Sequence, residues 1–138
     1  MFGNYQHSEL RIEVDATKNE LRESLTETAQ LRQWLWPQRL SSGMPGQLQI
    51  DTSFSSWSGP IEVQHRVSRL SSSGIQFVLS KGIDGFHEWS WGEGWVQSRL
   101  EGITLLPLSI GQTLALVRLQ FFLNRKGDFL SPDPVDVR

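Results

Sequence analysis

Segments that alternate between two side-chain faces, separated by short turns, constrain the fold more than any other feature of the chain. The alternating segments are residues 61–67, 75–79, 86–91 and 95–106. The turn residues between them lie at 71–74, 84–85 and 92–94. A two-residue period is typical of strands, and Asp84-Gly85 is a common hairpin turn. Sequential strands joined by short turns predict an antiparallel meander.

The segments before the meander predict further strands and two short helices. Residues 8–14 alternate as a first strand, and Leu48, Ile50, Thr52 and Phe54 alternate as another. Between them, Thr17 and Glu20 have the spacing of a helix-capping box. A second short helix is expected over residues 29–34, and Pro37 should end it because proline lacks the amide donor.

The last element is expected to be a long helix with two apolar stripes. Ser109 and Gln112 have capping-box spacing, and Gly127 can take a left-handed stop position after Lys126. One stripe consists of Ile110, Leu114, Val117 and Phe121. The broader stripe consists of Ala115, Leu116, Leu119, Phe122 and Leu123. A helix on one sheet needs one stripe, so the second must meet the short helices, the tail, a ligand or another subunit.

Composition excludes several classes of function. The chain has 138 residues, which suits one domain with its core over residues 8–126 and an irregular tail over 127–138. With no cysteine, disulfides and thiolate metal sites are excluded. The net charge of -2 offers no basic footprint for nucleic acid, and no apolar run reaches the ~20 residues of a membrane span. The polar amino terminus shows no signal peptide, so we expect a cytoplasmic protein.

An aromatic hairpin is the strongest candidate for a binding site, since three of the six tryptophans lie between Trp89 and Trp95. Val96, Ser98, Leu100, Gly102 and Thr104 share a small or apolar face, which we expect to point inward. A two-residue loop would place His87, Trp89 and Trp91 on that same face and build an aromatic wall. A three-residue loop would instead align Trp91 with Trp95 and His87 with Arg99. We favour the first because aromatic residues prefer burial.

The predicted order of elements resembles the START-like, or SRPBCC, helix-grip superfamily. Glu13-Val14-Asp15-Ala16 is similar to the opening strand of that superfamily, and residues 31–37 (LRQWLWP) are similar to its following helix. Residues 95–102 (WVQSRLEG), leading to Pro107, are similar to short bacterial members, particularly cyanobacterial ones. The resemblance implies an α+β fold in which a curved antiparallel sheet of about six strands wraps around the final helix.

The resemblance also implies a cavity for a small apolar or amphipathic molecule between the sheet and the final helix. The residues expected to bind it are His65, His87, Trp89, Trp91, Ser98, Leu100, Val117 and Phe121. We expect no catalysis and no cofactor, because the chain has no catalytic or dinucleotide-binding motif. We expect no metal, because the three histidines lack the spacing of a metal site. Two alternatives remain: a homodimer through the final helix, and a cyclase or aromatase that uses His87, Ser98 and His65.

Overall fold

The computed structural model describes residues 3–35 and 38–130, which form a seven-stranded antiparallel sheet with three helices. The strands, in chain order, are β1 (Asn4–Glu13), β2 (Arg39–Leu40), β3 (Ser53–Ser58), β4 (Ile61–Ser71), β5 (Gly74–Lys81), β6 (Asp84–Gly92) and β7 (Trp95–Thr104). In space they follow the order β1-β7-β6-β5-β4-β3-β2. Strands β2 to β7 are neighbours in chain order, as in the predicted meander, and β1 pairs with β7, which we did not predict. The predicted α+β arrangement is confirmed, with seven strands in place of about six.

Two short helices follow β1, as the sequence predicted. Helix α1 (Lys18–Thr26) begins at the capping box: Glu20 N donates to Thr17 Oγ1 over 3.1 Å, and Thr17 N donates to Glu20 Oε1 over 2.9 Å. Helix α2 (Thr28–Trp34) packs against α1, and the Trp34 indole donates to the Ser24 carbonyl over 2.8 Å. Pro37, which we expected to end this helix, lies outside the described residues.

Two predicted strands begin at other residues than we expected. Strand β1 extends back to Asn4, four residues before the predicted start at Ser8. The alternating segment from Leu48 is a loop up to Thr52, because Leu48 turns into the core while its amide donates to the Thr26 carbonyl. Leu48 is therefore apolar because it packs under the helices, and not because it lies on the inner face of a strand.

The predicted Asp84-Gly85 turn is also wrong. Both residues already belong to β6, and the chain turns one step earlier, with Lys81 at a φ of 71°. Gly85 is paired with Gly102 on β7, and a Cβ on Gly85 would collide with the Glu101 carbonyl. The glycine therefore permits a close approach of two strands and does not form the turn.

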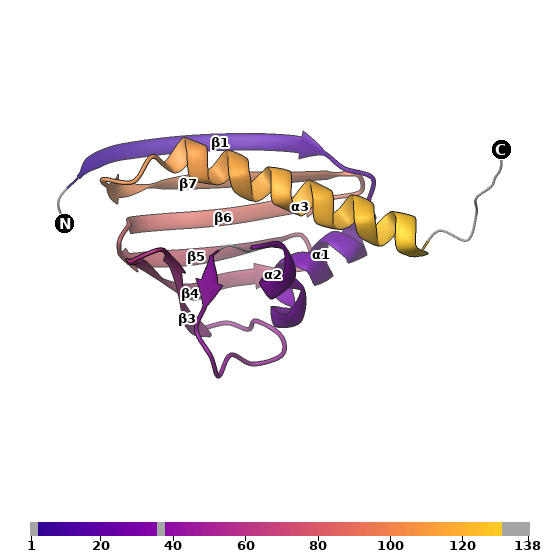
Figure 1. Ribbon diagram of the computed structural model, residues 1–138, viewed down its shortest axis with the longest axis horizontal. Coiled ribbons are helices and arrows are strands. Elements are labelled where there is room, and N and C mark those ends of the chain that lie inside the picture. The colour runs from indigo at the N-terminus through magenta and orange to yellow at the C-terminus, as the bar shows by residue number, and fades with distance from the viewer. Residues whose placement is uncertain (1–2, 36–37, 131–138) are drawn as a thin grey trace.

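Helix α3 (Leu108–Leu130) lies across the face of the sheet over β1 and β7 and touches α2 (Figure 1). The helix continues beyond Gly127, so the expected helix end at this residue is wrong. Glycine can adopt the left-handed conformation that ends a helix, but it can also remain helical. The expected capping box at Ser109 is wrong as well, because Gln112 reaches into the sheet instead. Within the part of the chain described, no helix is both long and apolar enough to cross a membrane.

The two apolar stripes of α3 have opposite environments. Leu116, Leu119 and Leu123, from the broader stripe, are buried in the core. The other stripe, Ile110, Leu114, Val117 and Phe121, is exposed. The helix is therefore rotated so that the broader stripe meets the sheet and the short helices.

Candidate functional site

A pocket of about 320 Å³ lies between the inner face of the sheet, the two short helices and the first turns of α3. Its walls include Leu25, Leu31 and Trp34 from the helices, Phe54, Val63, Phe77, Leu79 and Leu100 from the strands, and Ala115 from α3. It reaches the surface, because Ser58, Ile61, Pro107, Ile110, Gly111 and Leu114 both line it and are exposed. This volume is at the lower end of the usual range for small-molecule sites, ~300–1,000 Å³.

Rings from neighbouring strands form one continuous row along the wall of the pocket. Phe54 on β3 stacks on His65 of β4, with 4.7 Å between ring centroids and an angle of 6°. Phe77 on β5 meets the His65 ring edge-on. Farther along, His87 lies 4.9 Å from Trp89, which in turn contacts Trp34 of α2 at 5.9 Å. The inner face of the sheet therefore offers aromatic side chains, most of them at an angle to one another, to any occupant.

The hairpin between β6 and β7 has the register that we favoured. Trp91 pairs with Val96 and His87 pairs with Leu100, which leaves a two-residue loop at Glu93-Gly94. Gly94 takes a φ of 79°, a conformation that glycine adopts without strain. Trp95 lies on the outer face, where the Arg11 guanidinium sits 4.1 Å from its ring centroid. The prediction that His87 and Trp89 share the inner face is confirmed.

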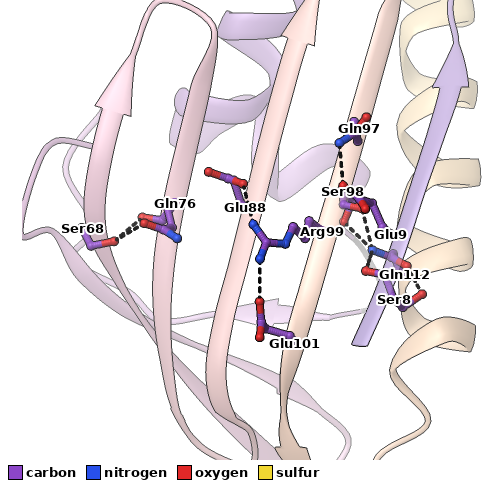
Figure 2. A network of polar contacts seen from close by, with 10 residues as sticks. All are labelled: Ser8, Glu9, Ser68, Gln76, Glu88, Gln97, Ser98, Arg99, Glu101 and Gln112. Atoms are coloured by element: carbon purple, nitrogen blue, oxygen red, sulfur yellow. Dashed lines mark hydrogen bonds and ion pairs between the residues drawn. The ribbon is translucent and has the colours of Figure 1, made fainter. Parts of the chain in front are cut away.

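His87 belongs to a buried polar chain that runs from the pocket to α3 (Figure 2 shows all but the histidine). Its Nε2 lies 2.9 Å from Ser98 Oγ on the neighbouring strand. Gln112 Nε2 donates to the Ser98 hydroxyl over 3.0 Å and to the Ser98 carbonyl over 2.9 Å. The Ser8 hydroxyl donates to Gln112 Oε1 over 2.6 Å.

Gln112 is the main site residue that our sequence analysis missed. It is 2% exposed, and it lies four residues before Leu116 on the helix face that also carries Leu119 and Leu123. Helical spacing places residues four apart on the same face, so a signal for burial was present. We assigned Gln112 to a cap because its spacing from Ser109 also matched that motif.

His65 also contacts a serine through one ring nitrogen, and its other ring nitrogen makes no hydrogen bond to a described residue. Its Nε2 lies 3.0 Å from Ser56 Oγ on β3. Its Nδ1 is enclosed and has no hydrogen-bond partner among the described residues. Burial lowers the pKa of His65 to about 4, and burial together with the nearby His65 lowers the pKa of His87 to about 3. Both imidazoles are therefore neutral at pH 7.

The structure brings half of the expected binding residues to the pocket. His65, His87, Trp89 and Leu100 line it. Ser98 lies behind His87, and Trp91 is enclosed in the core, where its indole donates to the Ser72 carbonyl over 3.0 Å. The expected position of Val117 and Phe121 is wrong: both are exposed on the outer side of α3, since the stripe with Leu119 faces inward.

No model of a protein family matches the chain, and no curated protein matches it. Solved structures do match. Protein CV1439 of Chromobacterium violaceum aligns over 85% of this chain and 96% of its own, with 13% identity and a TM-score of 0.70. The Aha1 dimer from Colwellia psychrerythraea aligns over 86% and 96%, with 13% identity and a TM-score of 0.60.

A third similar structure is DynU16, a protein of the dynemicin biosynthetic locus. It aligns over 96% of this chain but 51% of its own, with 19% identity and a TM-score of 0.59. This chain therefore spans about half the length of DynU16. At these identities the similarities show a shared fold, in which a sheet carries a long carboxy-terminal helix.

Proposed function

We propose that the chain is a START-like protein whose pocket binds a small apolar or amphipathic molecule without catalysing a reaction. The observation that carries this proposal is the 320 Å³ pocket, open to the surface and lined by apolar and aromatic side chains. A concave apolar site with a few polar groups is the usual form of a small-molecule site.

Binding is better supported than a cyclase or aromatase reaction. His87 and Ser98 are within hydrogen-bond distance, but Ser98 is fully enclosed and does not line the pocket. His65 and His87 each bond a serine of their own. A general base works best with a pKa near the working pH, whereas burial lowers the pKa of His65 to about 4 and of His87 to about 3.

A pair of substitutions on α3 tests the pocket. Ala115 lines it, and Val117, two residues later, is exposed on the other side of the helix. We expect Ala115→Phe to fill part of the pocket and to weaken binding of an uncharged hydrophobic dye, Nile red, at least tenfold. Val117→Phe adds a similar ring outside the pocket and should leave that affinity unchanged. Equal affinities for both variants, or no binding to the unaltered protein, would contradict the proposal.

A homodimer is the second candidate, because α3 carries an exposed apolar stripe of Ile110, Leu114, Val117 and Phe121. Isolated surface apolar residues are ordinary, but a stripe of four along one helix favours association. The similar Colwellia structure is that of a dimer. Sedimentation of the unaltered protein and of Phe121→Glu tests this candidate. A dimer that becomes a monomer in the variant supports it, and a monomer at every concentration excludes it.

A further inference from the structure

The described side chains that line the pocket include no aspartate, glutamate, lysine or arginine. The polar members of the lining are Gln38, Ser56, Ser58, His65, His87 and Gln112. The two imidazoles are uncharged at neutral pH, since burial lowers both of their pKa values. An ion that entered would leave water and find no opposite charge, and this is strongly unfavourable in an apolar site.

The hydrogen bonds around Ser98 place the proton of His87 on Nδ1. Gln112 Nε2 donates to Ser98 Oγ, so that oxygen is an acceptor there. The hydroxyl hydrogen of Ser98 is used only if it points at His87 Nε2, 2.9 Å away. A neutral imidazole carries one N–H, which is then at Nδ1.

The Nδ1–H of His87 is available to an occupant. No described residue bonds this nitrogen, and His65 Nδ1 is the one unpartnered side-chain atom that is fully enclosed among the described residues. His87 Nδ1 is therefore reachable, on a ring that lines the pocket. It presents a donor with no acceptor of its own.

Ser56 provides a second hydrogen-bond donor, and this follows from the enclosed ring nitrogen of His65. A buried N–H without an acceptor is rare, so the enclosed Nδ1 of His65 is the unprotonated nitrogen. His65 Nε2–H then donates to Ser56 Oγ, 3.0 Å away. The hydroxyl hydrogen of Ser56 remains free, and Ser56 lines the pocket.

We propose that the pocket selects uncharged ring compounds that present a hydrogen-bond acceptor, such as a ketone oxygen, to His87, and rejects the matching carboxylates. This inference rests on the proposed pocket function. The rings from Phe54 to Trp89 supply aromatic contacts for a ring compound, and the absence of charge in the described lining supplies the selection.

The expected discrimination follows from protonation. A carboxylic acid has a pKa of about 4, so roughly one molecule in a thousand is neutral at pH 7. If the pocket admits the neutral form alone, the carboxylate should bind roughly a thousandfold more weakly than the ketone, improving about tenfold for each pH unit lost. The gain from one neutral hydrogen bond is smaller, so the ketone should exceed the matching hydrocarbon by about fivefold.

Two matched series test the inference by calorimetry at pH 7. One consists of acetophenone, ethylbenzene and benzoate, and the other of 2-acetylnaphthalene, 2-ethylnaphthalene and 2-naphthoate. We expect the ketone to bind most tightly in each series, the hydrocarbon next, and the carboxylate at least a hundredfold below the ketone. His87→Phe should remove the ketone's advantage over the hydrocarbon. Phe86→Leu, an outward-facing change beside His87, should preserve it.

Other results separate this inference from the pocket function itself. If the hydrocarbon binds but the ketone binds no better, or if the carboxylate matches the ketone, the inference is overturned and the pocket function remains. If no member of either series binds, the pocket function is contradicted. If His87→Phe does not fold, the ranking of the three ligands by the unaltered protein still decides the question.

Discussion

The side-chain amide of Gln112 donates to the hydroxyl of Ser98 over 3.0 Å, in the space between α3 and the sheet. The same amide reaches the carbonyls of Ser98 on β7 and Ser8 on β1. One helical side chain therefore ties α3 to two strands that are far apart in sequence. Because Ser98 also contacts His87, this tie extends to the wall of the pocket.

Replacing Gln112 with leucine should lower the free energy of unfolding by about 2–3 kcal/mol. The change keeps the side-chain volume similar but leaves the hydroxyls of Ser8 and Ser98 with fewer partners in the interior. A buried polar group that loses its partner costs about 1–3 kcal/mol. Urea denaturation followed by circular dichroism measures the effect.

Gln120→Leu is the matched control on the same helix. Gln120 is exposed and makes one long contact, 3.4 Å, to the Glu13 carbonyl. Its replacement should change the free energy of unfolding by less than about 0.5 kcal/mol. Equal effects of the two substitutions would show that Gln112 does not anchor the helix.

Acid should destabilise the protein through its two pocket histidines. In the unfolded chain a histidine takes up a proton near pH 6.5, whereas burial lowers the folded pKa to about 4 for His65 and about 3 for His87. Their contribution is thus present above pH 6.5 and is lost as the pH falls toward those folded values. Between pH 7.5 and 5 each histidine should remove about 2 kcal/mol from the free energy of unfolding.

Urea titrations at several pH values between 5 and 7.5 measure this loss. His65→Phe, which keeps a ring beside Phe54, should reduce it by about half, because one titrating group remains. Hydrogen bonds from Ser55 and Lys81 lower the pKa of Glu62, so this carboxylate takes up its proton below the pH range of the titration. A loss of stability that is the same in His65→Phe would mean that His65 is already charged or solvated in the folded state.

Patterns of period two were sufficient to predict the meander from β4 to β7, and one capping box was sufficient to predict the start of α1. Alternation alone identified the inner face of β7, and the burial preference of tryptophan selected the hairpin register. The short β2 strand was missed because two residues carry no periodicity. The strand that we predicted from Leu48 is a loop up to Thr52, because a loop residue that packs beneath helices can be as apolar as a residue on a strand.

The candidate site was predictable only where a strand determined it. His87 and Trp89 follow from the register, but the wall contributed by Trp34 and Leu31 depends on how α2 packs over the sheet. Helical periodicity shows that two apolar stripes exist and does not show which one faces inward. That choice depends on tertiary contacts, including those of Gln112 with Ser8 and Ser98.

The close approach of β6 and β7 makes Gly102 intolerant of a side chain. A Cβ at this position would lie 2.7 Å from the Asp84 carbonyl oxygen, which is backbone and cannot swing aside. Gly102→Ala should therefore lower the free energy of unfolding by about 1–3 kcal/mol. Gly46→Ala, where nothing lies within 4 Å of the new carbon, should have little effect in the same denaturation experiment. Similar denaturation midpoints for both variants would mean that β6 and β7 are farther apart at Gly102 than the structure shows.

The orientation of α3 predicts different results at two neighbouring apolar positions. Leu119 is 0% exposed and Phe121 is 66% exposed. Leu119→Ala should open a cavity and lower the free energy of unfolding by about 3 kcal/mol, whereas Phe121→Ala should change it by less than about 0.5 kcal/mol. Both effects are measured by urea denaturation at low protein concentration. A larger effect at Phe121 than at Leu119 would mean that the helix is rotated and that the Val117 stripe faces the sheet.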